Sequence, residues 1–478
     1  MGTRAPKHSH LRQVLLGSIL SIGMLTGCSS DDDDSGEGYL MIYNASANAP
    51  ELTIEIEKED DTVSYGGIEA FSALGAMTLD SGNYPLQLEL ATSNEDTEVI
   101  YSSTDSVNSG DITFVAVTGD IKSPEILTFE YQYQDPDSED EQFLVKFLNL
   151  RENSQALDVY MSLADESFDE ATMVTTVSFA EMTEDFRYDV EDYKIYLTEN
   201  GSTEVLFESG DIPLLYTNQQ VFTILPSYHN DDQLMLNKIS PTGSVTEYME
   251  DSDVAKIKVY NAMDANDLLP EYSESMNFHL NDISETPLYS DIQRSQVSTT
   301  STVDAGDYGM DITTVDNADK LTHSQILSLP DGSDRTIFFY LTEVEEADDG
   351  DDETEEETSL YVNSLAVENE PMVGAYHHNI KVLNFVEDYA SVVVYFVGPD
   401  ESISTTSNKL TNSRAITSSI DLINDRYDIF VIGKEDSSDV LLKTAQLDLT
   451  EDSGNLFLVI EQEDKDIPNF SISQFSQN

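Results

Sequence analysis

The chain contains very little cysteine, tryptophan and positive charge. Its 478 residues include one Cys, no Trp and 22 Lys and Arg against 93 Asp and Glu, which gives a formal net charge of -71. A single Cys excludes an internal disulfide in a monomer. This charge repels phosphates and anionic headgroups, so nucleic acid is not an expected partner. Basic surfaces and divalent cations remain compatible with it.

The length and the apolar content indicate several folded domains. Domains usually have roughly 100 to 200 residues, so a chain of 478 residues predicts three or four of them. Hydrophobic residues make up 39% of the chain and aromatic residues 9%. Because this is enough apolar material for real cores, the high charge does not predict disorder.

The first residues have the pattern of a secretion signal. Arg4, Lys7 and Arg12 precede the apolar run Val14–Leu25. This run is too short to span a bilayer comfortably, so residues 1–27 are predicted to be a cleaved targeting segment. Removing it takes away three basic residues and leaves a net charge of -74.

The only Cys follows this segment directly. The tetrad Leu25-Thr26-Gly27-Cys28 resembles the lipobox of bacterial lipoproteins, in which the Cys becomes the lipidated N-terminus. The resemblance implies a membrane anchor on Cys28. Because Ser29 rather than Asp follows, it implies the outer membrane. Residues 28–38 are then predicted to be the lipidated Cys and a flexible acidic tether.

The remainder of the chain repeats four times. A strand-like segment ending in Asn recurs at intervals of 105, 112 and 123 residues, and a Tyr follows each Asn by 40 to 47 residues. A Phe follows each Tyr by 29 or 30 residues. The repeats are predicted at residues 39–134, 142–246, 254–372 and 377–476. The residues that mark them are Asn44, Asn149, Asn261 and Asn384, then Tyr84, Tyr193, Tyr308 and Tyr427, then Phe114, Phe222, Phe338 and Phe457.

Apolar residues alternate with polar ones in short runs within each repeat, and turn signals separate the runs. This pattern predicts an all-β protein, a tandem array of four antiparallel β-sandwich domains of immunoglobulin-like type, each with roughly seven strands. Only the segment Ala171–Arg187 leaves room for a short helix. Four domains placed end to end would make an array on the order of 130 Å long.

The repeated Tyr follows a turn and shares the phase of the apolar positions after it. Asp80-Ser81-Gly82-Asn83-Tyr84 and Asp304-Ala305-Gly306-Asp307-Tyr308 resemble the tyrosine corner of immunoglobulin-like sandwiches. In that motif the ring enters the core and the hydroxyl bonds to backbone a few residues upstream. Tyr84, Tyr193, Tyr308 and Tyr427 are therefore predicted to be structural tyrosine corners.

The first repeat also resembles a known family. Tyr43-Asn44-Ala45-Ser46-Ala47-Asn48-Ala49-Pro50, followed by alternating apolar residues and then Gly82-Asn83-Tyr84, is similar to domain-of-unknown-function family 4397. The resemblance implies tandem sandwich domains of a secreted or lipid-anchored bacterial protein. It brings no catalytic residues. Asn44 replaces the usual His of the first motif, and the later repeats lack the Ala-Pro pair.

No recognisable catalytic motif is present in the sequence. The five His residues after position 27 do not have zinc-protease spacing, and no Gly-x-Ser-x-Gly elbow or phosphate-binding glycine loop occurs. No metal ligand set is assigned. Calcium is the best small-ligand candidate, at the acidic segments Asp135–Glu141, Glu247–Asp253 and Asp348–Glu357, although these segments also suit solvated linkers.

These observations favour a non-enzymatic, lipid-anchored protein of the bacterial envelope with a binding, adhesion or structural role. Its expected partners are the membrane, through Cys28, and an envelope protein or polysaccharide. One alternative is an envelope polysaccharide hydrolase, with the insertions Asp264–Ser275 and Glu343–Glu357 of the third repeat as the place for a cleft. Another alternative is an adhesin stiffened by calcium.

Overall fold

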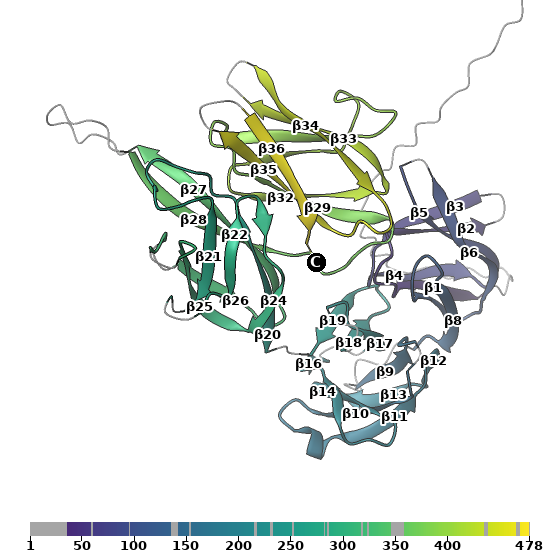
Figure 1. Cartoon of the computed structure of the whole chain (residues 1–478). Helices are drawn as coiled ribbons and strands as arrows, with labels where there is room; N and C mark the ends of the chain where they lie inside the picture. Colours follow the sequence, from purple (N-terminus) through teal and green to yellow (C-terminus); the bar gives the residue numbers. More distant parts are fainter. Residues whose placement is uncertain are drawn as a thin grey trace, which may run out of the picture. The chain divides into compact units, whose positions relative to one another are not determined.

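The computed structural model describes residues 36–477, with gaps at 59–60, 95, 135–141, 153, 215–217, 230–232, 251–252, 282, 284–285, 317–318, 323–324, 346–357, 435–437 and 465–468 (Figure 1). The predicted signal segment, Cys28 and most of the tether lie outside the described residues. The acidic segments 135–141 and 348–357 also lie outside the described residues.

The described strands form four β-sandwich domains, each of two sheets. The sheet that contains the first strand of a domain is called sheet I, and the other is called sheet II. In the first domain sheet I has the order β4-β1-β7-β8 and sheet II the order β3-β2-β5-β6. The strands are β1 (Glu37–Asn44), β2 (Leu52–Lys58), β3 (Asp61–Ile68), β4 (Ala73–Asp80), β5 (Gly82–Ala91), β6 (Thr97–Val107), β7 (Asp111–Thr118) and β8 (Glu125–Gln132).

The second domain repeats this plan with its edge strands broken into shorter pieces. Sheet I has the order β12-β9-β17-β18-β19, with β13 also on β9, and sheet II the order β11-β10-β14-β15, with β16 also on β14. The elements are β9 (Gln142–Asn149), β10 (Leu157–Leu163), the 3-10 helix η1 (Phe168–Glu170), β11 (Thr172–Val177), β12 (Glu181–Met182), β13 (Phe186–Asp189), β14 (Asp192–Glu199), β15 (Val205–Glu208), β16 (Ile212–Pro213), β17 (Gln219–Pro226), β18 (Leu234–Ile239) and β19 (Val245–Met249).

The third domain has sheet I in the order β23-β20-β27-β28, with β24 also on β20, and sheet II in the order β22-β21-β25-β26. Its strands are β20 (Val254–Asn261), β21 (Ser275–Leu280), β22 (Tyr289–Gln293), β23 (Gln296–Val297), β24 (Ser301–Asp304), β25 (Gly306–Thr313), β26 (Gln325–Leu329), β27 (Asp334–Glu345) and β28 (Thr358–Glu368).

The fourth domain has sheet I in the order β32-β29-β35-β36 and sheet II in the order β31-β30-β33-β34. Its strands are β29 (His377–Asn384), β30 (Ser391–Val397), β31 (Lys409–Ser413), β32 (Thr417–Ile423), β33 (Asp425–Lys434), β34 (Asp439–Leu449), β35 (Leu456–Asp464) and β36 (Asn469–Ser476).

The prediction of an all-β chain of tandem sandwiches is confirmed, with two differences in topology. Each sheet I contains one parallel pair, formed by β1 and β7, β9 and β17, β20 and β27, and β29 and β35. The strand orders 4-1-7-8 and 3-2-5-6 also differ from the ABED and CFG sheets of an immunoglobulin constant domain. Sequence periodicity reports the face of a strand and not the direction of its neighbour, so neither feature was predictable from the pattern.

The segment Ala171–Arg187, where the sequence leaves room for a short helix, contains no helix. That segment forms β11, β12 and the start of β13, and the helix within the described residues is the 3-10 turn Phe168–Glu170 just before it. Thr172–Val177 is rich in β-branched residues, which favour strands over helices.

Each domain has its own core between sheets I and II, but the outer face of sheet I is also apolar. In β1, Leu40 and Ile42 face the core of the first domain, whereas Met41 and Tyr43 belong to a second cluster that contains Leu148 of the second domain. Tyr260 and Phe338 of the third domain form a similar cluster with residues of the fourth, including Leu383, Phe385, Phe457 and Val459. Central strands of sheet I are therefore buried on both faces.

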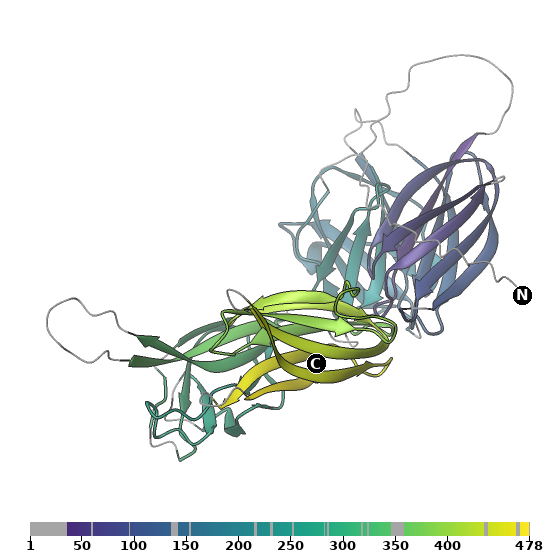
Figure 2. The ribbon, with the colours of Figure 1, turned by 90° about the horizontal axis from the view of Figure 1, so that it is seen from above.

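The domains thus pack in two pairs, first with second and third with fourth, through their sheets I. In Figures 1 and 2 the green strands of the third domain lie beside the yellow strands of the fourth. In the first pair, the Ala76 N–H of β4 donates to the Pro241 carbonyl at 2.8 Å. Gly75 lies so close to this turn that an added Cβ would be 2.5 Å from the Thr242 oxygen. These sheet-to-sheet contacts were not expected from domains placed end to end.

Candidate functional site

Each of the four marker tyrosines bonds to the backbone four residues upstream. The hydroxyls of Tyr84, Tyr193, Tyr308 and Tyr427 donate to the carbonyls of Asp80, Asp189, Asp304 and Ile423 at 2.7, 3.0, 2.5 and 3.0 Å. The second and fourth domains make this bond without the Gly that precedes Tyr84 and Tyr308 by two residues. Tyr427 also accepts a bond from Asn94 of the first domain, and burial raises its pKa to about 12.

The four marker Asn residues are fully buried at the end of the first strand of each domain. The Asn44 Oδ1 accepts from the Ser46 N–H, and its Nδ2 donates to the Ile68 carbonyl at 3.2 Å. Their backbone carbonyls accept from four residues in the left-handed conformation, Phe71, Ala180, Ser295 and Ala415, whose φ values are 56°, 58°, 56° and 56°. These residues form the connection by which the chain passes from sheet II back to sheet I.

The motif that resembles the family serves as a structural loop. Ser46 donates to the Gly119 carbonyl at 2.7 Å, and Asn48 donates to the Asp120 carboxylate at 2.9 Å. The hydrogen bond from Asn48 lowers the pKa of Asp120. The loop after β1 is thereby joined to the turn after β7. Beside it lies a hollow of about 250 Å³ between the first two domains, where Phe71 and Tyr228 stack at 5.5 Å.

Buried tyrosines of the odd-numbered domains reach across both paired interfaces. The Tyr43 hydroxyl accepts from Asn237 Nδ2 of the second domain at 2.8 Å, and Tyr260 donates to Glu461 of the fourth at 2.9 Å. Burial raises the pKa of both tyrosines far above its usual range. The even-numbered domains have Leu148 and Leu383 at the same position, directly before the marker Asn.

Glu461 is the most unusual ionisable group of these interfaces. It is 2% exposed and its Oε2 accepts from the hydroxyls of Tyr260, Ser295 and Ser473, whereas Oε1 has no hydrogen-bond partner among the described residues. Burial raises the pKa of Glu461, against the opposing effect of these hydroxyls and of Arg294. Nothing in the sequence distinguishes this residue, because acidic residues are too common in the chain for one to stand out.

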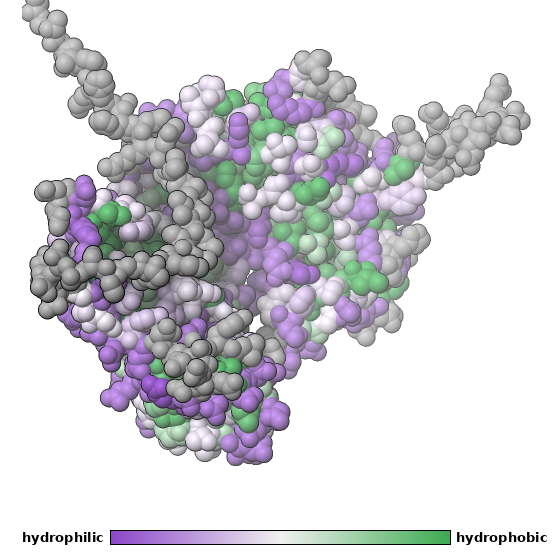
Figure 3. Space-filling model, turned by 180° about the vertical axis from the view of Figure 1, so that it is seen from behind, coloured by the Kyte–Doolittle hydropathy of each residue, from purple (hydrophilic) through white to green (hydrophobic). Residues whose placement is uncertain are grey.

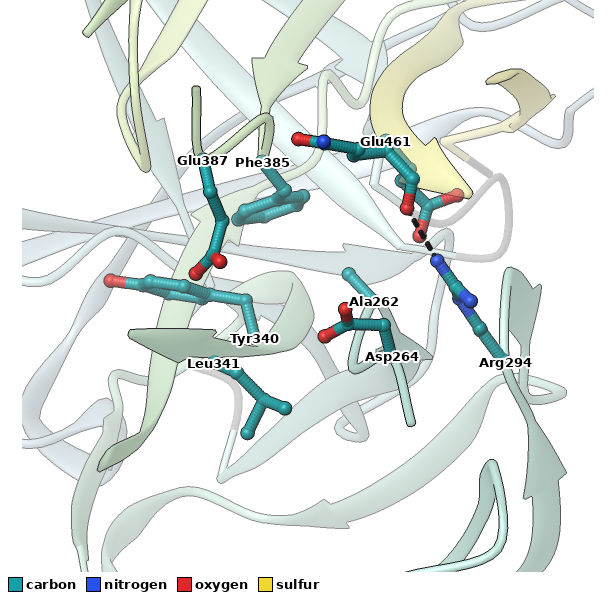
Figure 4. Close-up of a pocket in the computed structure, with 9 residues that line it drawn as sticks. Ala262, Asp264, Arg294, Tyr340, Leu341, Phe385, Glu387 and Glu461 are labelled. Carbon is teal, nitrogen blue, oxygen red and sulfur yellow. Dashed lines mark hydrogen bonds between the residues drawn. The ribbon is translucent and has the colours of Figure 1, made fainter. Parts of the chain in front are cut away.

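Glu461 lies beside a small cavity between the third and fourth domains (Figure 4). Arg294 extends toward β35 and donates to the Gln462 carbonyl at 2.6 Å, and the Tyr340 and Phe385 rings stack at 5.0 Å. The cavity volume is about 20 Å³, which is the space of roughly one water molecule. Asp264 lines it, so the insertion at 264–275 contributes to an interface and forms no large cleft here.

A larger hollow than these two is a groove on the outer face of sheet II in the fourth domain. This Tyr395 groove has a volume of about 910 Å³. Its floor includes Tyr395 and Phe430, which are directly opposite each other on β30 and β33. Its lining residues are Tyr395, Val397, Gly398, Pro399, Glu401, Ser402, Ile403, Ser404, Arg426, Asp428 and Phe430. The volume lies in the range of small-ligand and side-chain pockets.

The loop over this groove is held in place by its own hydrogen bonds. The Glu401 carboxylate accepts from the Gly398 N–H at 3.0 Å, and the buried Thr406 hydroxyl donates to the Phe396 carbonyl at 2.9 Å. Arg426 lies 3.7 Å from Asp448, and Lys409 lies 5.7 Å from the centre of the Tyr395 ring. The groove is therefore built from aromatic rings, with two carboxylates, Glu401 and Asp428, and the cations Arg426 and Lys409 around them.

Histidines and carboxylates do not gather into a metal site in the described part of the chain. No group of three His, Cys, Asp or Glu there is arranged to hold a metal ion. His378 is buried, and its two ring nitrogens lie 3.0 Å from the Gly454 carbonyl and 2.7 Å from Asn424 Oδ1. The ring thus joins two turns of the fourth domain.

Exposed large apolar side chains occur in all four domains. Figure 3 shows separate hydrophobic areas among hydrophilic residues on one face of the molecule. The most exposed large apolar residue of the described set is Ile326 on β26, at 85%. Among the described residues no helix has the length and apolarity needed to cross a membrane.

One known protein family matches part of this chain. Residues 38–160 match the model of the family described as Domain of unknown function (DUF4397), so the recognised resemblance is confirmed for that region. The match begins at the second residue of β1, covers the rest of the first domain and ends within β10 of the second. No curated protein matches the sequence.

Several solved structures show remote similarity to this chain, among them the following three. The TIE protein of Bacillus anthracis is 9% identical over 91% of this chain and 76% of its own, with a TM-score of 0.16. A putative cell adhesion protein from Parabacteroides distasonis is 11% identical over 69% and 98%, with a TM-score of 0.15. The major pilin subunit of Bacillus cereus is 10% identical over 67% and 99%, with a TM-score of 0.14. TM-scores this low carry no information about the activity of this chain.

Proposed function

We propose that the chain is a non-enzymatic protein of the bacterial envelope that is anchored through a lipid on Cys28, in the outer membrane, and acts in binding, adhesion or as a structural element. The observation that carries the binding or structural part of the proposal is the pairing of sandwich domains through their sheets I. In each pair the two sheets I pack against each other and form the interface. The outer faces of the sheets II are then the faces that could contact a partner.

The hollows of the structure are consistent with this role. The cavity beside Glu461 has room for about one water molecule, so it does not admit a substrate. The Tyr395 groove is open on the sheet surface, and its lining residues include neither His nor Cys. Its rings and carboxylates suit recognition of a partner group.

The anchor is supported by the sequence alone, through the resemblance of Leu25-Thr26-Gly27-Cys28 to a lipobox. A single acyl chain gives only marginal membrane binding, so several acyl groups on one Cys would be needed for stable attachment.

Metabolic labelling with a fatty-acid analogue tests the anchor. We expect the wild-type chain to be labelled and to sediment with the outer membrane, and Cys28→Ala to be unlabelled and soluble after fractionation. A Ser29→Ala variant serves as the matched control and should be labelled like the wild type. An unlabelled wild-type chain would overturn the anchoring proposal.

A further inference from the structure

The second and fourth domains share an aromatic pair on the outer face of sheet II. Tyr160 on β10 is directly opposite Tyr196 on β14, and Tyr395 on β30 is directly opposite Phe430 on β33. In both domains the first residue follows the marker Asn by 11 positions and the second follows the corner Tyr by 3. The two pairs therefore occupy the same position of the repeat.

In the second domain a third ring from the same chain covers this pair. Phe168, in the connection from β10 to β11, lies 5.2 Å from the Tyr160 ring and 5.3 Å from the Tyr196 ring. Both contacts have the tilted or edge-to-face geometry that aromatic rings prefer. The Tyr196 hydroxyl also bonds to the Glu166 carbonyl of this connection.

In the fourth domain the corresponding connection, residues 398–408, contains no aromatic residue. It bends over the sheet with Ile403 on the rim and encloses the Tyr395 groove of about 910 Å³. The ring position that Phe168 occupies in one domain is thus an open groove in the other.

The charges at the groove and on the whole chain bear on what kind of partner could place a ring there. Glu401 and Asp428 line the groove, and its one lining cation, Arg426, lies next to Asp448. Lys409 lies over the Tyr395 ring, as expected for a cation attracted by an aromatic face. The net charge of -71 adds attraction for a basic partner and repulsion for a second copy of this chain.

We propose that the Tyr395 groove binds an aromatic side chain of a partner polypeptide, flanked by basic residues, in the place that Phe168 fills within the second domain. This inference rests on the proposed binding function and names the class of its partner. The ring would contact Tyr395 and Phe430, and the flanking cations would lie near Glu401 and Asp428.

The absence of Trp from the chain allows a direct test. The probe is the blocked tripeptide Lys-Trp-Lys, whose fluorescence can be excited selectively in the presence of the purified full chain. We expect a saturable blue shift of its emission. The blocked tripeptide Glu-Trp-Glu should bind at least about tenfold more weakly, which corresponds to about 1.4 kcal/mol.

The matched variants use residues that the fold already accommodates. The first domain has Gln87 and Glu55 at the positions of Phe430 and Tyr395, and these two are likewise directly opposite each other. Phe430→Gln should weaken Lys-Trp-Lys binding at least about tenfold. Tyr395→Gln, which unlike Glu adds no charge that would attract the peptide, provides a second variant if the first alters the circular dichroism spectrum. Ile326→Gln, on the exposed edge of the third domain, should leave binding unchanged.

Three results would overturn the proposal. The first is the lack of any shift with Lys-Trp-Lys, and the second is equal binding by the wild type and both groove variants. The third is binding of a neutral oligosaccharide such as cellohexaose in place of the peptide. Because the titration uses purified protein, its failure is distinguishable from a failure of Cys28 labelling in cells.

Discussion

The four corner tyrosines place the same hydrogen bond at the same point of each domain. Their hydroxyls reach the carbonyl four residues upstream whether the preceding turn contains Gly, as before Tyr84, or not, as before Tyr193. The bond therefore depends on the ring position and the turn backbone, not on one glycine. This makes each tyrosine a local support for the start of a central strand of sheet II.

Removal of one of these hydroxyls should have a moderate cost. Tyr84→Phe keeps the ring in the core and leaves the Asp80 carbonyl without this donor, so we expect about 1 kcal/mol of destabilisation. The measurement is the midpoint of thermal unfolding. Tyr65→Phe, on the more exposed strand β3, is the control and should leave the midpoint unchanged. Equal midpoints for Tyr84→Phe and wild type would refute the assigned role.

Glu461 should make stability depend on pH. A carboxyl whose pKa is higher in the folded than in the unfolded chain adds stability that is fully present below the unfolded pKa, about 4.3, and is lost as pH rises through the folded pKa. Glu461→Gln keeps a neutral side chain with an acceptor for Tyr260. We expect its unfolding midpoint to fall less than that of the wild type between acidic and neutral pH.

The control for this pH series is Glu57→Gln, an exposed position on β2. Its midpoint should follow the wild-type pH curve. Parallel curves for Glu461→Gln and the wild type would show that the buried carboxyl does not contribute to the pH dependence.

At the level of elements, the left-handed residues mark the return from sheet II to sheet I. Ala180 has a φ of 58°, and its N–H donates to the Asn149 carbonyl at 2.8 Å. A β-branched residue tolerates this backbone poorly. Ala180→Val should therefore destabilise the chain by about 1 to 2 kcal/mol. Ala171→Val is the matched control, because Ala171 has a φ of -67° in the extended region. The unfolding midpoints of both variants measure the difference, and equal midpoints would contradict it.

A one-residue change in spacing has a visible effect on strand β17. Phe114, Phe338 and Phe457 follow their corner tyrosines by 30 residues and face the paired interfaces, whereas Phe222 follows by 29 and faces its own core. Thr223 takes the outer position, 3.4 Å from the Tyr43 hydroxyl. Because side chains alternate along a strand, a shift of one residue exchanges its two faces.

This case shows how far the sequence predicts the fold. Alternation and repeat spacing were sufficient for strands and domains, because most strands of the sheets II alternate apolar core residues with polar outer residues, as in β2 and β5. Alternation and repeat spacing did not predict that the domains pack in pairs through their sheets I, although the sequence contains two signals for this packing. The run Val221–Leu225 lacks the alternation of a half-buried strand, and Tyr43 and Tyr260 alternate with Leu148 and Leu383 before the marker Asn.

The candidate groove was less predictable than the fold. Tyr395 and Phe430 are 35 positions apart in the sequence and become neighbours only through the pairing of β30 with β33. The depth of the groove depends on how residues 398–408 bend over them, which no local pattern specifies. The corner tyrosines, in contrast, are set by contacts with residues four positions away.

At the scale of the molecule, charge should make stability depend on salt. With a net charge of -71, mutual repulsion opposes the folded state most strongly at low ionic strength. We expect the unfolding midpoint to rise by several degrees from low salt to about half-molar sodium chloride, where the Debye length is well below 10 Å. Potassium chloride should act equally if screening is the cause. An unchanged midpoint would contradict the expectation.

The shared interface of the first pair also bears on how the chain is made. Synthesis completes the first domain while the second is still being translated, so Tyr43 and Phe114 have no cover at that stage. A chain that has folded its first domain alone presents an apolar sheet face to other chains. Two consecutive domains, not one, are thus the smallest segment that can fold with its hydrophobic surfaces closed.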